Sequence, residues 1–327
     1  MEPETIFIVV VIVVVLLLLC LRRRRRRVVG VAGSGVGAEQ EVKEEMSSSS
    51  SVHTESIVKS NSVLKLFKKN DVNDLMHNFK NLDDVSDAIR KAGLESCNLI
   101  FGIDYTGSNY MQGKKTFGGK CLHHIDPAEL NPYQKVICIM GETLEPFAED
   151  GHIPTFGFGD TYTRDHSVFS LSSMVPANTA PCRGFQDVLK MYNEMTPKVR
   201  LGGPTNFAPL IRQAIDIVSK NRSFHILVIV ADGQVTAERD TTAAIVQASN
   251  YPLSIIMVGV GDGPWDMMRD FDDKLPARRF DNFRFVNFNQ VTNNVKSPQA
   301  AFALQALMEI PDQYKAIRRL GLMEFTH

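Results

Sequence analysis

Three short stretches, far apart in the chain, carry side chains that could bind one metal ion together. The first spans residues 104–108, the second is the Gly-Gly-Pro-Thr loop at 202–205, and the third begins at residue 232, directly after a long apolar run. They supply two carboxylates and three hydroxyls, and hard divalent cations prefer such all-oxygen ligand sets. The sequence therefore predicts a Mg²⁺ site, with Mn²⁺ and Ca²⁺ as alternatives, formed by Asp104, Thr106, Ser108, Thr205 and Asp232.

The spacing of these residues supports a shared site. Residues at i, i+2 and i+4 point the same way along an extended backbone, so Asp104, Thr106 and Ser108 can face one ion. The glycines before Thr205 let that backbone approach closely, and Asp232 without a cation would be a costly charge beside a buried strand. Asp and Thr are also common helix caps, so each residue alone fits a cap better than a ligand. The three stretches together favour the metal site.

Apolar runs that alternate with helical patterns predict the elements that position these residues. Strands are expected at residues 98–103, 153–158, 225–231, 253–260 and 283–288. Helices are expected at residues 132–147, 185–195, 207–219, 241–249 and 265–271, and a last helix begins at 299–307 before Pro311 interrupts it. Residues 64–93 are also helical in pattern, with Asp83 or Asp84 as a cap and Gly93 as the end.

This alternation predicts a doubly wound α/β fold, in which a mostly parallel sheet is flanked by helices. The expected strands are continuously apolar, which is typical of strands whose two faces are both covered. In such sheets ligands bind at the carboxyl ends of the strands, where Asp104 and Asp232 both fall.

The N-terminal segment predicts a membrane-anchor helix. Sixteen apolar residues, 6–21, are followed directly by six arginines, from Arg22 to Arg27. A cleavable signal peptide would carry its positive charges first. The observed order favours an uncleaved single-pass membrane anchor, 1–27, with the rest of the chain in the cytosol. The apolar run is slightly short for a spanning helix, but arginine stems extend it, and the arginines would attract anionic membrane lipid.

Composition divides the rest of the chain into a linker and a folded domain. Residues 28–62, which include a serine run, are expected to form a disordered linker, and they hold no G-x-G-x-x-G pattern. Residues 63–327 are expected to form the domain with an N-terminal helical extension. Five cysteines without a C-x-x-C pair argue against a disulfide framework or a zinc finger. The formal net charge is −1, and −7 without the six arginines, so nucleic acid is not an expected partner.

The predicted metal-binding stretches resemble the metal-ion-dependent adhesion site of von Willebrand factor A domains, which have a Rossmann-like fold. From about Asp83 to about Leu322 the chain resembles the copine branch of that superfamily. It is most similar to plant-type ubiquitin ligases that pair a copine A domain with a RING finger. The copine resemblance is carried by residues 131–133, 156–160, 203–207, 245–249 and 252–261, and the ligase resemblance by residues 94–96, 261–268 and 280–283.

The resemblance implies a bound ion with an open position, which the Asp or Glu carboxylate of a partner protein fills. Asp104, Ser108 and Thr205 would then ligate the ion directly. Thr106 or Asp232 would act through water in some states. Mg²⁺ keeps several waters when bound and suits this arrangement.

Two parts of these relatives have no counterpart in this sequence: the paired lipid-binding C2 domains and the RING finger. A RING needs closely spaced Cys and His ligands. The adjacent His123 and His124 do not form that pattern and are expected to be structural or surface residues. The leading hypothesis is a membrane-anchored adaptor that binds proteins through Mg²⁺ and is not itself an enzyme. The alternative is a ubiquitin-protein ligase family member, acting with the ubiquitination machinery, whose RING is absent or truncated.

Two further functions fit the residues less well. Metal-dependent hydrolysis would need a base beside the ion, and no motif supplies one. Calcium-switched lipid binding by the arginines would need a calcium sensor, which the sequence without C2 domains does not provide.

Overall fold

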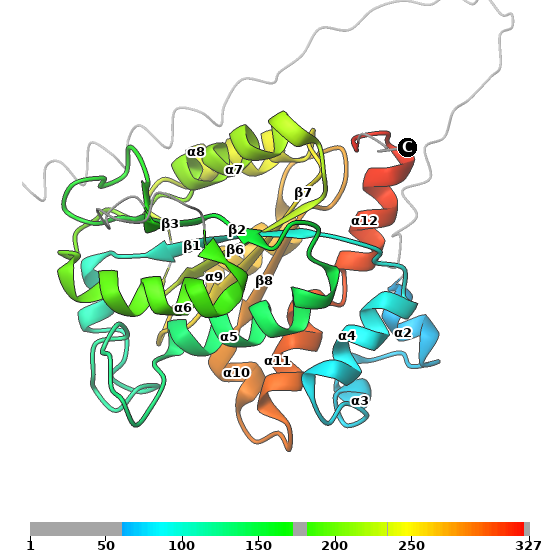
Figure 1. The fold of residues 1–327 in the computed structure, drawn as a ribbon, viewed down its shortest axis with the longest axis horizontal. Coiled ribbons are helices and arrows are strands. Elements are labelled where there is room, and N and C mark those ends of the chain that lie inside the picture. The colour runs from blue at the N-terminus through cyan, green and yellow to red at the C-terminus, as the bar shows by residue number, and fades with distance from the viewer. Residues whose placement is uncertain (1–60, 173–181, 234, 324–327) are drawn as a thin grey trace, which may run out of the picture. The chain divides into compact units, whose positions relative to one another are not determined.

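The fold is organised around β6 (His225–Ala231), a strand of seven buried residues (Figure 1). The computed structural model describes residues 61–172, 182–233 and 235–323. The other strands are β1 (Asn98–Asp104), β2 (His152–Ile153), β3 (Thr155–Phe158), β4 (Phe169–Ser170), β5 (Cys182–Arg183), β7 (Leu253–Gly259) and β8 (Phe283–Asn287). Six of them form a sheet of order β4-β3-β1-β6-β7-β8, in which β4 is antiparallel to β3 and the other neighbours are parallel.

Helices cover both faces of this sheet (Figure 1). On one face the core is completed by α7 (Ala208–Asn221), α8 (Glu238–Ala248) and α9 (Asp266–Lys274). On the other face it is completed by α4 (Leu82–Lys91), α5 (Pro132–Leu144), α6 (Gly184–Met195), α11 (Pro298–Leu307) and α12 (Ile310–Arg319). The short helices α2 (Ser62–Leu66), α3 (Val72–Met76) and α10 (Phe288–Thr292) join this second face.

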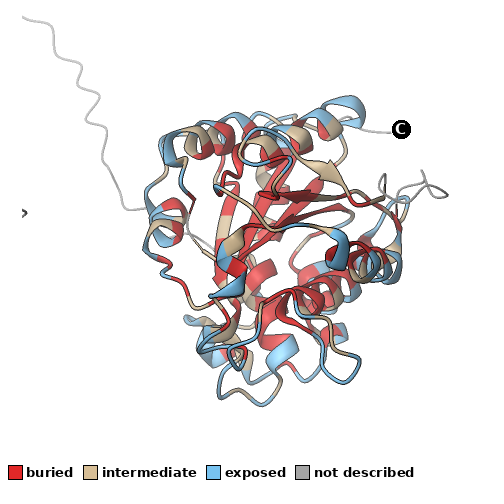
Figure 2. Cartoon of the chain, turned by 90° about the vertical axis from the view of Figure 1, so that its left-hand side faces the viewer, coloured by how far each residue is buried: buried red, intermediate tan, exposed pale blue. Residues whose placement is uncertain are grey.

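The register between β1 and β6 divides their side chains between the two faces. Ile100 lies opposite Leu227, and both pack in the cluster that includes α7. Phe101 lies opposite Val228, and both pack in the cluster that includes α5. Because both faces are covered, every residue of β1, β6 and β7 is buried (Figure 2). The predicted α/β fold with a mostly parallel sheet is confirmed.

The predicted strand at 153–158 is broken into two. Pro154 separates β2 from β3, and it has no N–H to donate to a sheet. Its carbonyl still accepts a hydrogen bond from the backbone N–H of Phe101, at 2.9 Å. Upstream of the proline, β2 pairs with β5 in a separate two-stranded sheet.

The segment 64–93 forms three short helices instead of one long helical stretch. Each helix starts at its own N-cap, and these caps lie ten residues apart: Asn61, Asp71 and Asn81. The predicted cap at Asp83 or Asp84 is wrong, because the side chain of Asn81 already accepts a hydrogen bond from the N–H of Asp84, at 2.8 Å. The predicted end at Gly93 is confirmed; its φ of +113° suits glycine.

The expectation that Pro311 interrupts a helix is also wrong. The helix α11 ends at Leu307, and Pro311 lies in the first turn of α12. A proline is tolerated there because the first turn of a helix does not use its N–H groups.

The predicted membrane anchor, 1–27, and nearly all of the predicted linker, 28–62, lie outside the described residues. The first described helix, α2, begins at Ser62. Within the described ranges, no helix combines the length and apolar character that a membrane span needs.

Candidate metal centre

The two predicted carboxylates lie together at one edge of the sheet. Asp104 is the last residue of β1, and Asp232 directly follows β6. These strands are parallel neighbours with Ile103 opposite Val230, so their carboxyl ends meet. Both aspartates are buried, with exposed fractions of 0% and 1%.

A chain of hydrogen bonds joins these two carboxylates through Thr106 and Ser108. The backbone N–H of Thr106 donates to Oδ1 of Asp104 at 2.8 Å, and its hydroxyl lies 2.8 Å from the hydroxyl of Ser108. Oγ of Ser108 in turn donates to Oδ1 of Asp232 at 2.9 Å. Four of the five predicted site residues are therefore in one connected cluster.

The first stretch reaches this geometry by a different route from the one predicted. Thr106 is extended, but residues Gly107–Tyr110 form a 3₁₀ turn, so Ser108 does not continue an extended backbone. The turn instead carries Ser108 toward β6, where its hydroxyl meets Asp232. Asp104, Thr106 and Ser108 do lie together, as predicted, but the assumption that the loop is extended through Ser108 is wrong.

The loop that carries Thr205 is joined to the same cluster through the backbone. Gly202 accepts a hydrogen bond from the N–H of Gly107 at 2.7 Å and donates one to the carbonyl of Tyr105 at 3.0 Å. The carbonyl of Thr205 accepts from both the N–H and the hydroxyl of Thr236, each at 2.9 Å. The structure therefore places this loop beside the other two stretches, and ligation by the Thr205 hydroxyl stays a prediction.

The two carboxylates are incompletely satisfied. Among the described residues, Oδ2 of Asp104 and Oδ2 of Asp232 are buried and have no hydrogen-bond partner. Burial raises the pKa of Asp104 to about 6. Burial, and then the negative charge of Asp104, raises the pKa of Asp232 to about 8. A buried acceptor without a donor is costly, and two neighbouring buried negative charges are costlier still.

A divalent cation fits this donor set. Positive charge between the carboxylates would offset their repulsion and satisfy the two free oxygens, and the hydroxyls nearby are also oxygen donors. The described part of the chain has no group of three or more His, Cys, Asp or Glu side chains arranged to hold a metal ion. The remaining ligands at this centre would therefore be hydroxyls, carbonyls or water, as hard cations allow.

Two glycines leave room for the site residues. A Cβ on Gly159 would lie 2.5 Å from Cγ2 of Thr106, and the φ of this glycine is +76°. A Cβ on Gly261 would lie 2.8 Å from the carbonyl oxygen of Asp232. Both close approaches give a physical reason for glycine at these two positions.

Sequence reasoning missed three polar side chains that contact the backbone carbonyl of Asp104. Its carbonyl oxygen lies 2.7 Å from Nε2 of His123, 3.2 Å from the hydroxyl of Tyr133 and 3.3 Å from Nδ2 of Asn109. The imidazole is stacked between Tyr105 and Tyr133, at ring-centroid distances of 4.7 and 4.1 Å. Asn109 is five residues from Asp104, but no local spacing could have revealed His123 and Tyr133, which come from separate segments.

The protonation of His123 follows from its partners. Burial lowers its pKa to about 4, so the ring is neutral at pH 7. A carbonyl can only accept, which places the proton on Nε2. Nδ1 then accepts from the hydroxyl of Tyr192, at 2.7 Å. The predicted structural role of His123 is confirmed, and His124 is exposed, as expected for a surface residue.

Comparison with known proteins decides the family. The copine family model matches residues 121–325. The chain belongs to the copine family. It is 56% identical over 269 residues to Copine family protein 2 of Caenorhabditis elegans. This match covers 82% of this chain and 4% of that protein. It is 53% identical over 262 residues to E3 ubiquitin-protein ligase RGLG4 of Arabidopsis thaliana. This match covers 75% of this chain and 64% of that protein.

This copine domain thus corresponds to part of each of those two relatives. The predicted resemblance to copines and to the plant ubiquitin ligases is confirmed by these matches. Among solved structures, the manganese-loaded Plasmodium vivax TRAP protein aligns over 66% of this chain and 74% of its own, with 10% identity and a TM-score of 0.43.

Proposed function

We propose that this copine domain is an adaptor that binds proteins through a divalent cation, with Mg²⁺ as the ion. Asp104, Ser108 and Thr205 would hold the ion directly, and Thr106 and Asp232 would complete the site directly or through water. The observation that carries the proposal is the pair of buried carboxylate oxygens, Oδ2 of Asp104 and Oδ2 of Asp232, that lack a hydrogen-bond donor.

The residues of the centre have separate tasks in this proposal. The two aspartates supply negative charge at adjacent strand ends, and the hydroxyl of Ser108 fixes their relative position through its bond to Asp232. When bound, the ion would supply an electrophilic position that a carboxylate of the partner protein can occupy. Ser108 is the most exposed member of the cluster, so the partner would approach from its side.

Calorimetric titration of the purified chain with Mg²⁺, followed by partner capture with and without EDTA, tests this proposal. We expect Asp104→Asn to abolish the heat of Mg²⁺ binding and the part of partner capture that EDTA removes. The reason is that this variant lacks one of the two negative charges that the cation needs. Asp216→Asn is the matched control, since Asp216 is exposed on α7. Equal Mg²⁺ binding by both variants would contradict a cation at this centre.

A second candidate function, participation in ubiquitin ligation, is favoured by the 53% identity to a protein named as an E3 ubiquitin-protein ligase. The test is reconstitution of the chain with ubiquitin, an activating enzyme and a set of conjugating enzymes. Ubiquitin conjugates that form only when the chain is present would support ligase activity. An adaptor without such activity would leave the conjugates at the background level.

We also propose that residues 1–27 anchor the copine domain to a membrane with the domain in the cytosol. The support is the order of the sixteen apolar residues and the six arginines. Carbonate extraction of cell membranes tests it. The full chain should stay in the pellet and a chain lacking residues 1–27 should not, whereas release of both would contradict the anchor. Replacing the six arginines by glutamine would separate the contribution of anionic lipid.

A further inference from the structure

A groove on the α5 face of the domain has no part in the proposed metal centre. Its volume is about 760 Å³, and it lies between α5, the loop before it, α10, α11 and the start of α4. Its apolar lining includes the buried side chains of Ile139, Phe288 and Ala300 and, at 41% exposure, Leu130. We call it the basic groove, because three lysines also line it: Lys80, Lys135 and Lys296.

The charge of this groove is opposite to that of most of the chain. Glu129 is the acidic residue among the described side chains that line it, and it pairs with Lys135 at 3.5 Å. Within the described residues, neither Lys80 nor Lys296 has an ion-pair partner, and both are exposed. Residues 61–327 have a net charge of −2, so a groove with a net charge of +2 is a local exception on this domain.

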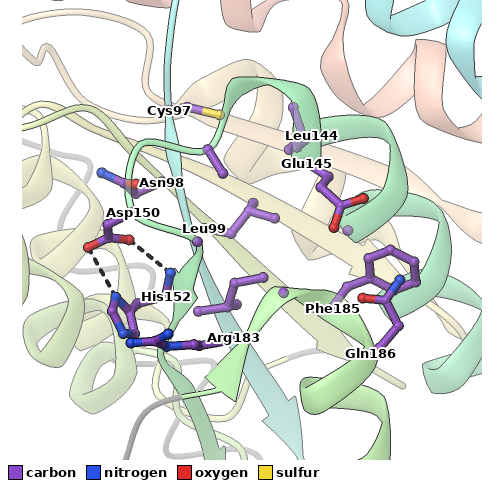
Figure 3. A pocket seen from close by; sticks show the side chains of 15 residues that line it. Cys97, Asn98, Leu99, Leu144, Glu145, Asp150, His152, Arg183, Phe185 and Gln186 are labelled. Carbon is purple, nitrogen blue, oxygen red and sulfur yellow. Dashed lines mark hydrogen bonds and ion pairs between the residues drawn. The ribbon is translucent and has the colours of Figure 1, made fainter.

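A second cavity shows that concavity alone does not select a ligand. It has a volume of about 330 Å³ and lies at the amino end of β1 (Figure 3). There Asp150 pairs with His152 at 3.5 Å, and Glu145 and Arg183 carry opposite charges. With the histidine neutral, its lining carries two acidic side chains and one arginine, so its net charge is −1 and opposite in sign to that of the basic groove.

We propose that the basic groove binds an acidic peptide segment of a partner protein, with one or more apolar side chains on its floor. Lys80 and Lys296 would face the carboxylates of the peptide. Leu130, with the small exposed part of Phe288, would contact its apolar side chains. A peptide suits the groove better than a bilayer, because a flat membrane surface cannot reach a recessed floor. This site is independent of the cation, so it would be a second recognition surface on the same domain.

Fluorescence anisotropy with a short labelled peptide, in which glutamates flank a pair of leucines, tests the proposal. The titration is made in EDTA, so that the carboxylates of the peptide cannot use a cation at the metal centre. We expect saturable binding that weakens at least about tenfold in the double variant Lys80→Glu/Lys296→Glu. The control is Lys198→Glu/Lys220→Glu, which makes the same change in net charge at exposed positions outside the groove.

Cysteine protection locates the bound peptide. Cys138 lines the basic groove, while Cys121 is equally half-buried in another part of the domain. The peptide should slow alkylation of Cys138 and leave that of Cys121 unchanged. Absence of binding, equal loss in both double variants, or protection of Cys121 alone would overturn the proposal. So would sedimentation with phosphatidylserine vesicles that depends on Lys80 and Lys296 while the peptide does not bind.

Discussion

The two ends of β1 differ in how their polar groups are satisfied. At the amino end, Nδ2 of Asn98 donates to Glu149 and to Ser223, each at 3.1 Å, and Asp150 pairs with His152. At the carboxyl end, Asp104 is fully buried beside Asp232, and each keeps a carboxylate oxygen without a donor. A fold that needed only stability would have no reason to keep the second arrangement. The difference indicates which end of the strand is built for binding.

The largest effect on stability is expected from His123→Ala, next to the carboxyl end of β1. This change removes a buried ring between two tyrosines and leaves the hydroxyl of Tyr192 with only the longer contact to Oδ1 of Asn131, at 3.5 Å. We expect unfolding free energy to fall by roughly 3 kcal/mol or more. Urea denaturation measures it, with the exposed neighbour His124→Ala as the control, for which a change within about 0.5 kcal/mol is expected. Similar losses for both variants would show that His123 does not support the site.

Asp232→Asn should separate stability from cation binding. Removing one of two neighbouring buried charges should stabilise the metal-free protein at pH 8, because the pKa of Asp232 is raised by burial and by Asp104. The same change should weaken Mg²⁺ binding at least about 100-fold, or roughly 2.7 kcal/mol. Thermal melts with and without Mg²⁺ measure both effects. A variant that is less stable without metal would contradict the repulsion between the two aspartates.

The pH dependence of the metal-free protein should be set by both aspartates below pH 6 and mainly by Asp232 above pH 6.5. Raised pKa values, about 6 for Asp104 and about 8 for Asp232, contribute stability that is complete below pH 4 and is lost as pH rises through those values. The lowered pKa of His123, about 4, acts oppositely, with stability lost as pH falls from 6.5 through 4.

Between pH 6.5 and 8 Asp232 therefore dominates among these three groups, because Asp104, with a pKa of about 6, is mostly ionised there in the folded state too. Metal-free stability should decline in this range by no more than roughly 1.4 kcal/mol per pH unit. Saturating Mg²⁺ should reduce this decline, because the cation binds the ionised carboxylates. Denaturant titrations at several pH values measure it. A decline that Mg²⁺ leaves unchanged would argue against binding at these aspartates.

The smallest effect is expected at the amino end of β1, from Asp150→Asn. Its side chain is 61% exposed, and even a fully charged pair this exposed contributes little. We expect the unfolding free energy and the Mg²⁺ affinity to stay within about 0.5 kcal/mol of the original protein. A large loss in this variant would remove the contrast between the two ends of the strand.

The sequence predicted the carboxyl end of β1 well for a physical reason. Asp104 and Asp232 each follow an uninterrupted apolar run, and parallel strands bring their carboxyl ends together. Those two facts are local and topological, so they can be read from the chain. The path of Ser108 could not be predicted, because the 3₁₀ turn of Gly107–Tyr110 and the extended alternative fit the same spacing.

Features that depend on distant segments escaped prediction. His123 lies in a loop without a helical or strand pattern, and its burial follows from Tyr105, Tyr133 and Tyr192. The cap at Asn81 was missed because Asp83 and Asp84 are equally good capping residues, and the choice depends on where the preceding helix ends. Pairing of β2 with β5 likewise joins segments that no local pattern relates.

The carbonyl of Asp104 is contacted by a ring, a phenol and an amide that come from separate parts of the chain. One side of the proposed ion site is thereby held in place before any ligand binds. The opposite side, residues 202–205, is held by hydrogen bonds to the backbone of Gly202 and Thr205 and includes Gly203 at a φ of +140°. A carboxylate that enters between them would therefore meet two sides that hydrogen bonds already hold in place.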